Sequence, residues 1–149
     1  MLRTAFVIAA IAIGVTAVAA QSNPVEERSA LMNSMWRDAW GPITRMVQGK
    51  EPYDQAKVDA GFARAAEIAT KARPLWPDNA KGVAAKAQFT SSSKIWENKS
   101  DFNAKFDEFA KELVANRPKA KDIEGLKVAF KPVDKACDNC HEPYRVRAR

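Results

Sequence analysis

Residues 122–141 read DIEGLKVAFKPVDKACDNCH, and this stretch carries both a helical pattern and an unusual cluster of reactive side chains. Asp122 can cap a helix whose apolar residues recur every three or four positions. That face consists of Ile123, Leu126, Phe130, Val133 and Cys137. Pro132 lies inside the pattern, where it can bend a helix. The sequence therefore predicts an amphipathic helix from about Asp122 that ends on the pentapeptide CDNCH, residues 137–141.

The pentapeptide places two sulfurs and an imidazole together. Positions i, i+3 and i+4 share one face of a helix, so Cys137, Cys140 and His141 point the same way. This arrangement suits two thioether bonds to the vinyl groups of a porphyrin, with the imidazole reaching its iron. His141 is the only histidine of the chain, and the two cysteines are the only cysteines. The motif predicts one covalently attached haem c with His141 as an iron ligand.

Three other kinds of site use cysteines at this spacing: a structural disulfide, a zinc site and a thiol-disulfide oxidoreductase. Zinc needs a fourth ligand beyond Cys137, Cys140 and His141, and only carboxylates without an evident spacing remain. A thioredoxin-like motif sits at a strand-to-helix junction of an α/β pattern, which this sequence lacks. Haem attachment is the preferred interpretation, and the oxidoreductase is the alternative from the enzyme class.

The first segment of the mature chain also has helical spacing. Asn23 is the expected N-cap, Pro24 lies in the first turn, and Gly41-Pro42 can introduce a kink. The residues predicted to be buried are Val25, Met32, Met35, Trp36, Ala39, Ile43 and Met46. This pattern predicts one long, kinked helix.

Two more helices are predicted between the first and the last. One follows an Asp54 cap and stops before Pro74. Its apolar face is Val58, Phe62, Ala65, Ala69 and Ala72. The other follows a Ser100 cap and ends shortly before Pro118. Its apolar face is Phe102, Phe106, Phe109 and Leu113. Residues 74–93 between them are expected to form a long loop with one short helical turn.

The four helical segments are joined by breaks that contain proline, and no period-two strand pattern of useful length appears. The predicted fold is all-α: an antiparallel four-helix bundle with one covalently bound haem. We expect a single domain over residues 21–149, because 46% of the residues are hydrophobic and 28% are charged, which is an ordinary globular composition.

The first twenty residues have the pattern of an export signal. Arg3 precedes an uncharged run from Thr4 to Ala20 that ends in small residues. We expect residues 1–20 to be a signal peptide cleaved before Gln21, because the run is short for a bilayer span and no basic flank follows it. The predicted location is the periplasm, with no stable membrane insertion after cleavage.

The chain is mildly basic, with a formal net charge of +6 at pH 7. Its lysines and arginines are interleaved with acidic residues except in the tail, at Arg145, Arg147 and Arg149. Without a continuous basic stripe, no nucleic-acid partner is expected. Arg145 follows His141 by four residues and can pair with a haem propionate if the helix continues past Pro143. The other two tail arginines are expected to be solvated.

A haem motif at the carboxyl end of a four-helix chain, followed by Tyr144-Arg145, resembles the cytochrome c-prime family of class II c-type cytochromes. The similarity extends over residues 21–149 and includes Arg28, Pro52-Tyr53-Asp54 and Ile95-Trp96. The resemblance implies that Arg28 lies near a haem propionate. It also implies that the residue four positions further on, Met32, faces the iron; Met32, Met35 and Met46 are the available thioether ligands.

Residues 75–78 and 91–96 resemble the low-spin members, in which this methionine binds the iron, and Trp76 would then form part of the pocket wall. The function this implies is periplasmic electron transfer without bond-making catalysis, with redox proteins as partners. The alternative is a five-coordinate, high-spin protein that binds nitric oxide or carbon monoxide, with Met32 as packing only. Family members often pair through their first two helices, so a homodimer is compatible with the resemblance. Trp40 would equally be an isolated exposed aromatic on the first helix.

Overall fold

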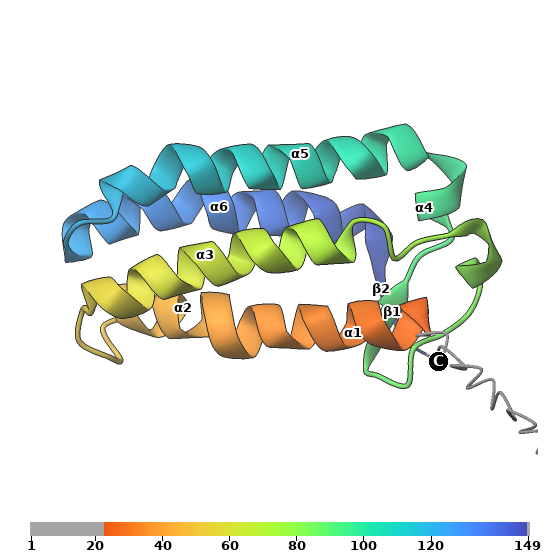
Figure 1. The fold of residues 1–149 in the computed structure, drawn as a ribbon, viewed down its shortest axis with the longest axis horizontal. Coiled ribbons are helices and arrows are strands. Elements are labelled where there is room, and N and C mark those ends of the chain that lie inside the picture. The colour runs from red at the N-terminus through yellow and green to blue at the C-terminus, as the bar shows by residue number, and fades with distance from the viewer. Residues whose placement is uncertain (1–22, 149) are drawn as a thin grey trace, which may run out of the picture.

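The protein is a bundle of four long helices in a computed structural model that describes residues 23–148. Successive long helices run in opposite directions (Figure 1), as predicted. The first comprises α1 (Pro24–Ser34), η1 (Met35–Trp40) and α2 (Gly41–Val47), and the others are α3 (Gln55–Ala72), α5 (Lys99–Asn116) and α6 (Ile123–Tyr144). The expected signal peptide and Arg149 lie outside the described residues. Within those residues, no helix combines the length and apolar character that a membrane crossing requires.

Side-chain caps begin the long helices. Asn23, Asp54 and Asp122 accept hydrogen bonds from backbone N–H groups of the first turn, as predicted. The cap of α5 is Asn98 rather than Ser100, because the Asn98 amide oxygen accepts from the backbone N–H of Asp101 at 3.2 Å. Ser100 therefore already lies inside the helix.

The first helix is interrupted by a π-helical turn, η1, where a kink was expected. Pro42 has no backbone N–H, and the N–H of Gly41 bonds to the carbonyl of Trp36, five residues back. A β-carbon at position 41 would collide with that same carbonyl oxygen, so the turn needs glycine. The additional residue in the turn rotates the helix face. The prediction that Trp36 is buried is therefore wrong: its side chain is 61% exposed.

Trp40 is buried instead, so its assignment as an exposed surface aromatic is also wrong. Its ring stacks on Phe130 at a centroid distance of 5.2 Å and meets Phe62 edge-on at 5.7 Å. Its indole N–H donates to the Asp134 carboxylate at 3.0 Å. A buried tryptophan with a satisfied N–H contributes both apolar area and a polar anchor. Trp40 therefore ties the first, second and last long helices together in the main core.

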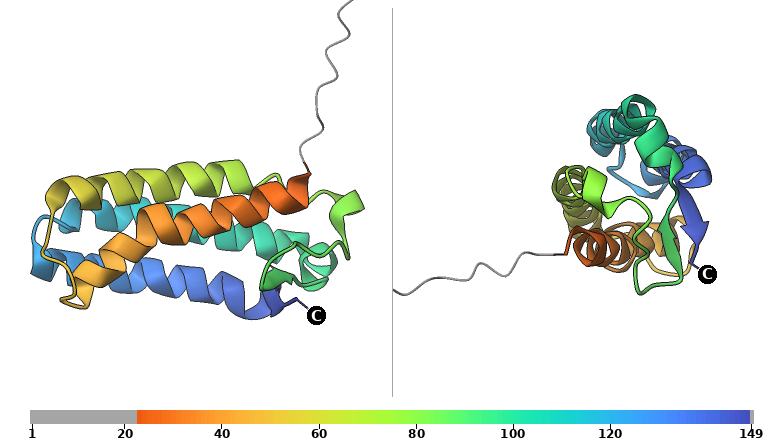
Figure 2. Two further views of the ribbon diagram at one scale, coloured as in Figure 1. Left: turned by 90° about the horizontal axis from the view of Figure 1, so that it is seen from below. Right: turned by 90° about the vertical axis from the view of Figure 1, so that its right-hand side faces the viewer.

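The connection from α3 to α5 holds more structure than the expected loop. It contains η2 (Asp78–Ala80), strand β1 (Phe89–Ser91) and α4 (Lys94–Glu97). Strand β1 pairs antiparallel with β2 (Arg145–Arg147) at the end of the chain, between α1 and α6 (Figure 2). No strand was expected from the sequence, and these two short strands are where the structure differs. Arg145 lies in β2 and not on a continued helix, because α6 ends at Tyr144.

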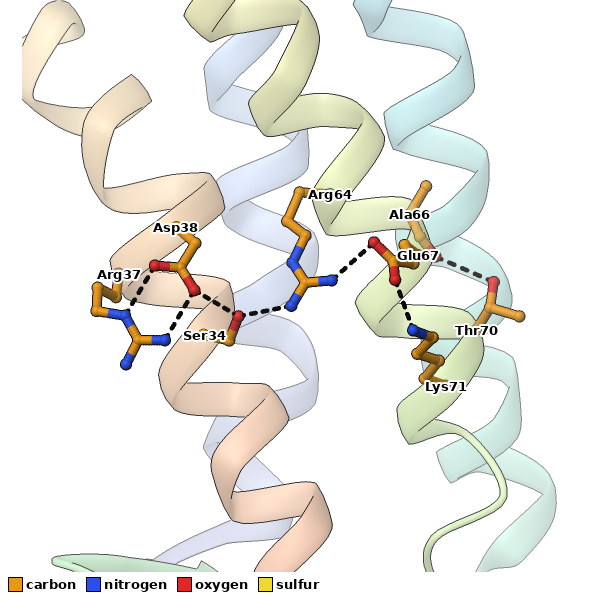
Figure 3. A network of polar contacts seen from close by, with 8 residues as sticks. All are labelled: Ser34, Arg37, Asp38, Arg64, Ala66, Glu67, Thr70 and Lys71. Atoms are coloured by element: carbon orange, nitrogen blue, oxygen red, sulfur yellow. Dashed lines mark hydrogen bonds and ion pairs between the residues drawn. The ribbon is translucent and has the colours of Figure 1, made fainter.

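A chain of polar contacts joins the first helix to α3 (Figure 3). The Ser34 hydroxyl donates to Asp38 at 2.7 Å and accepts from the Arg64 guanidinium at 3.0 Å. Asp38 also receives two hydrogen bonds from Arg37, and Glu67 receives one each from Arg64 and Lys71. The hydrogen bonds from Arg37 and Ser34 lower the pKa of Asp38 to about 2. Those from Lys71 and Arg64 lower the pKa of Glu67 to about 2.

The close approach of α3 to the first helix yields a stability prediction. A β-carbon on Gly61 would lie 2.9 Å from the Ala39 carbonyl oxygen and 2.8 Å from the Ile43 Cδ1 atom. Gly61→Val should lower the free energy of unfolding by about 1–3 kcal/mol, because the helices must separate. Ala63→Val, at an exposed position of the same helix, should cost less than about 1 kcal/mol. Equal losses in denaturant titration would contradict close packing at Gly61.

The two shifted carboxyls predict a dependence on pH. Because their pKa values are lower in the folded state, they stabilise the fold above the unfolded values near pH 4 and lose this effect as the pH falls toward 2. Asp38→Asn and Glu67→Gln should therefore flatten the decrease of Tm between about pH 4 and 2. Glu26→Gln, which removes an exposed carboxyl outside the network, serves as the control and should leave the slope unchanged.

Candidate functional site

The last turns of α6 bring the three motif residues to one cavity, as the helical spacing predicts. Cys137, Cys140 and His141 are all partly buried and all line it. The cavity measures about 510 Å³ and lies among α1 with η1, the connection around β1, α5 and the end of α6. This volume falls within the range of roughly 300–1,000 Å³ that is usual for cofactor and ligand pockets. A smaller cavity of about 60 Å³ shares the three motif residues.

The cavity walls are largely aromatic and apolar. Trp40, Trp76, Ile95, Phe102, Phe106 and Tyr144 contribute side chains to them. Trp76, predicted as a wall residue, donates its indole N–H to the Ser91 hydroxyl at 2.9 Å and meets Phe102 edge-on at 4.9 Å. Tyr144 is fixed by a hydrogen bond of 2.5 Å from its hydroxyl to Asp101. These contacts give the pocket rigid walls that can cover the faces of a large planar group.

Arg28, assigned to a propionate by resemblance, reaches the same cavity from the first helix. Its side chain is only 4% exposed, and its Nη1 atom donates to the Leu75 carbonyl at 3.0 Å. The guanidinium lies 5.5 Å from the Trp76 ring and 5.9 Å from the Trp96 ring. Burial lowers the pKa of Arg28. Its Nη2 atom has no hydrogen-bond partner among residues 23–148. A buried cation with a free donor is suited to an anionic group in the cavity.

The three candidate methionines differ in their surroundings. Met32 and Met35 both line the two cavities that also contain His141. Met35 packs against the main core, whereas Met32 packs against neither hydrophobic cluster of the described chain. Met46 is 1% exposed inside the core and lines neither of these cavities. The fold thus brings Met32 and Met35 to the site and keeps Met46 away from it.

The pKa values of the motif residues favour His141 as a metal ligand and do not favour Cys137 or Cys140 as reactive thiols. Burial raises the pKa of Cys137 to about 12 and that of Cys140 to about 11. A nucleophilic cysteine needs the opposite shift, so the structure does not favour the thiol-disulfide oxidoreductase. Burial, and then the charge of Arg145, lower the pKa of His141 to about 4. Its imidazole is therefore neutral at pH 7, with a lone pair free for a metal.

The disulfide and zinc interpretations lack structural support. Cys137 and Cys140 are not bonded to each other. Within the part of the chain that the structure describes, no three His, Cys, Asp or Glu side chains group as a metal site. The iron of a haem differs from zinc here, because the porphyrin supplies four of its ligands and the protein needs to supply one or two.

Arg145 lines the cavity, but its surroundings differ from those expected. It is exposed in β2 and its guanidinium lies 4.9 Å from the Phe89 ring. One wall of the cavity was not predicted from the sequence: the connection contributes Ala85, Ala87, Gln88, Phe89, Thr90 and Ser91. No periodicity marks these residues, and only the pairing of β1 with β2 brings them to the site. A haem nonetheless fits the donor set: two cysteines, one neutral imidazole, apolar walls and one buried cation with a free N–H.

Comparison with known proteins agrees with this geometry. The family model described as cytochrome c′ matches residues 23–145. Cytochrome c-556 of Rhodopseudomonas palustris is 37% identical over 146 residues, which cover 97% of each chain. Cytochrome c-555 of Bradyrhizobium diazoefficiens is 31% identical over the full length of both chains. A structure of oxidised R. palustris cytochrome c556 superposes with a TM-score of 0.76 at 35% identity, covering 87% of this chain and all of the other.

Proteins of this family contain covalently bound haem c, are typically periplasmic and are generally not enzymes. The family match extends over nearly all of the described residues, and two relatives exceed 30% identity over essentially the whole chain. The chain therefore belongs to the cytochrome c′ family and is a haem protein.

Proposed function

We propose that this protein transfers electrons in the periplasm, with His141 and Met32 as the two axial ligands of one haem iron. The observation that carries the proposal is the position of Met32. It lines the same two cavities as His141, from the opposite end of the sequence, and its thioether is not committed to the core. A methionine whose side chain serves only as packing would be expected among the core clusters, as Met35 is.

The residues around the site have distinct tasks in this proposal. Bound haem supplies an iron that accepts and returns one electron. Cys137 and Cys140 would hold the haem by thioether bonds, and the neutral His141 nitrogen would bind its iron. The Met32 sulfur would be the second protein ligand of that iron and would favour its reduced state, which would raise the reduction potential. Trp76 forms part of the wall and limits access of water.

Arg28 and Arg145 are placed to interact with the propionates of a bound haem. The free Nη2 donor of Arg28 is buried in the cavity wall, where a carboxylate would satisfy it and offset its desolvation. Arg145 is exposed at the edge of the same cavity and provides a weaker, solvent-screened interaction. We therefore assign Arg28 the larger part in holding a propionate.

Electron transfer requires redox proteins as partners, and we propose no nucleic-acid partner or membrane insertion for the mature chain. Charged residues of both signs alternate along the sequence, and many are paired on the surface of the bundle. A homodimer through the first two long helices is compatible with the proposal and is not required by it.

Replacing Met32 tests the iron ligation. Met32→Ala should convert a low-spin spectrum to a high-spin one, lower the reduction potential and allow carbon monoxide to bind. Met35→Ala is the matched control, three residues away on the same cavities, and should leave the low-spin spectrum unchanged. A wild-type protein that is already high-spin and binds carbon monoxide or nitric oxide readily would contradict the electron-transfer proposal and favour the five-coordinate alternative.

Covalent attachment is tested by the mass of the purified protein made in a host able to attach haem. Wild type should retain its red colour after acid-acetone extraction and have the mass of polypeptide plus one haem, because thioether bonds hold the group. Cys137→Ala and Cys140→Ala should each impair attachment, and His141→Ala should lose the proximal bond. A colourless wild-type protein with two titratable thiols would instead support the oxidoreductase.

A further inference from the structure

The larger cavity reaches the surface of the protein, because part of its lining is exposed. Six of its lining residues are exposed: Asn33, Trp36, Gln88, Phe89, Asp138 and Arg145. They come from the first long helix, from the connection beside β1, and from the end of α6 with β2. We call these six residues the mouth. A group held by Cys137 and Cys140 would lie in the cavity that opens here, so the mouth offers a route by which an electron can enter or leave.

Large apolar side chains are exposed around the mouth. Trp36 is 61% exposed and Phe89 38% exposed, and Val146 on the neighbouring strand is 43% exposed. The π-helical turn sets Trp36 in this position, since it rotates Trp40 rather than Trp36 into the core. Exposed apolar side chains that gather in one place are characteristic of surfaces that bind another protein. Tryptophan and arginine in particular are enriched at the centre of such interfaces.

Two arginines at this edge are held in place by the strand pair, and no carboxylate side chain of the described residues pairs with either. Pairing of β1 with β2 sets Arg145 and Arg147 over the Phe89 ring, at 4.9 and 5.9 Å from its centroid. Neither forms an ion pair with any residue between 23 and 148, whereas Arg37 beside Trp36 is paired with Asp38. Of the carboxylates lining the cavity, Asp134 accepts the Trp40 indole N–H, which leaves Asp138 as the exposed one.

We propose that the mouth, with Arg147 and Val146 at its edge, is the docking surface for an acidic redox protein. The inference rests on the proposed electron-transfer function and adds the place and the chemistry of the partner. Trp36 and Phe89, which both line the cavity, supply the apolar part of the surface. Arg147 attracts the acidic side chains of the partner, and Arg145 is shared with a haem propionate. Such attraction raises the association rate and weakens as salt is added.

A small anionic oxidant tests the charge. In the reaction, the reduced protein loses one electron and hexacyanoferrate(III) gains it. Arg147→Glu should slow the reaction by about threefold or more at low ionic strength, and the effect should shrink in salt. Lys121→Glu makes the same change of net charge at an exposed site before the first turn of α6, at the other end of the bundle from β2 (Figure 1). Equal effects of the two variants would overturn the proposal.

A redox-inert anion provides a readout that does not depend on electron transfer. Paramagnetic hexacyanochromate(III) should selectively broaden the amide NMR signals of residues 89 and 145–147 in the intact holoprotein. Arg147→Gln should weaken this broadening, and Lys121→Gln should not. Uniform broadening would overturn the proposal of an acidic partner. Protection of the mouth that grows with protein concentration would also overturn it, because it would indicate that a second copy of this chain covers the mouth. A high-spin spectrum together with selective broadening would instead contradict the proposed function alone.

Discussion

The structure depends on one constraint: a single helix must both complete the core and present two sulfurs and an imidazole to a cavity. Leu126, Ala129 and Val133 on the earlier turns of α6 are fully buried in the main core. The last turns hold Cys137, Cys140 and His141, which are only partly buried against open space. Core and cavity therefore lie along successive turns of one helix, and the connection from α3 to α5 forms part of the cavity wall.

The buried Arg28 shows how the open end is organised. Removing a guanidinium from water is costly unless its donors find acceptors. Here the Leu75 carbonyl and the faces of Trp76 and Trp96 compensate part of that cost, and one donor stays free toward the cavity. The same side chain thus positions the connection and offers a charge to a ligand. An anionic group with apolar faces, such as haem, satisfies both requirements.

Helical spacing alone cannot distinguish the two methionines at the cavity. Met32 and Met35 are three residues apart and fall on one helical face, so periodicity treats them as equivalent. The resemblance to the family singled out Met32, and the structure adds that the two side chains pack differently. Likewise, the motif predicted where the cysteines and histidine point, but only burial in the folded chain lowers the pKa of His141 to about 4 and so keeps the imidazole neutral.

The sequence by itself determined the local features: four helices with their apolar faces, three of the caps, and the shared direction of the motif side chains. These follow from a repeat of 3.6 residues and from contacts within a turn. Only the tertiary structure decided that Trp40 rather than Trp36 is buried, because one π-helical turn shifts the repeat. Only the tertiary structure placed Arg145 in a strand and the connection in the cavity wall. A three-residue strand has no readable period, and its partner lies far away in the chain.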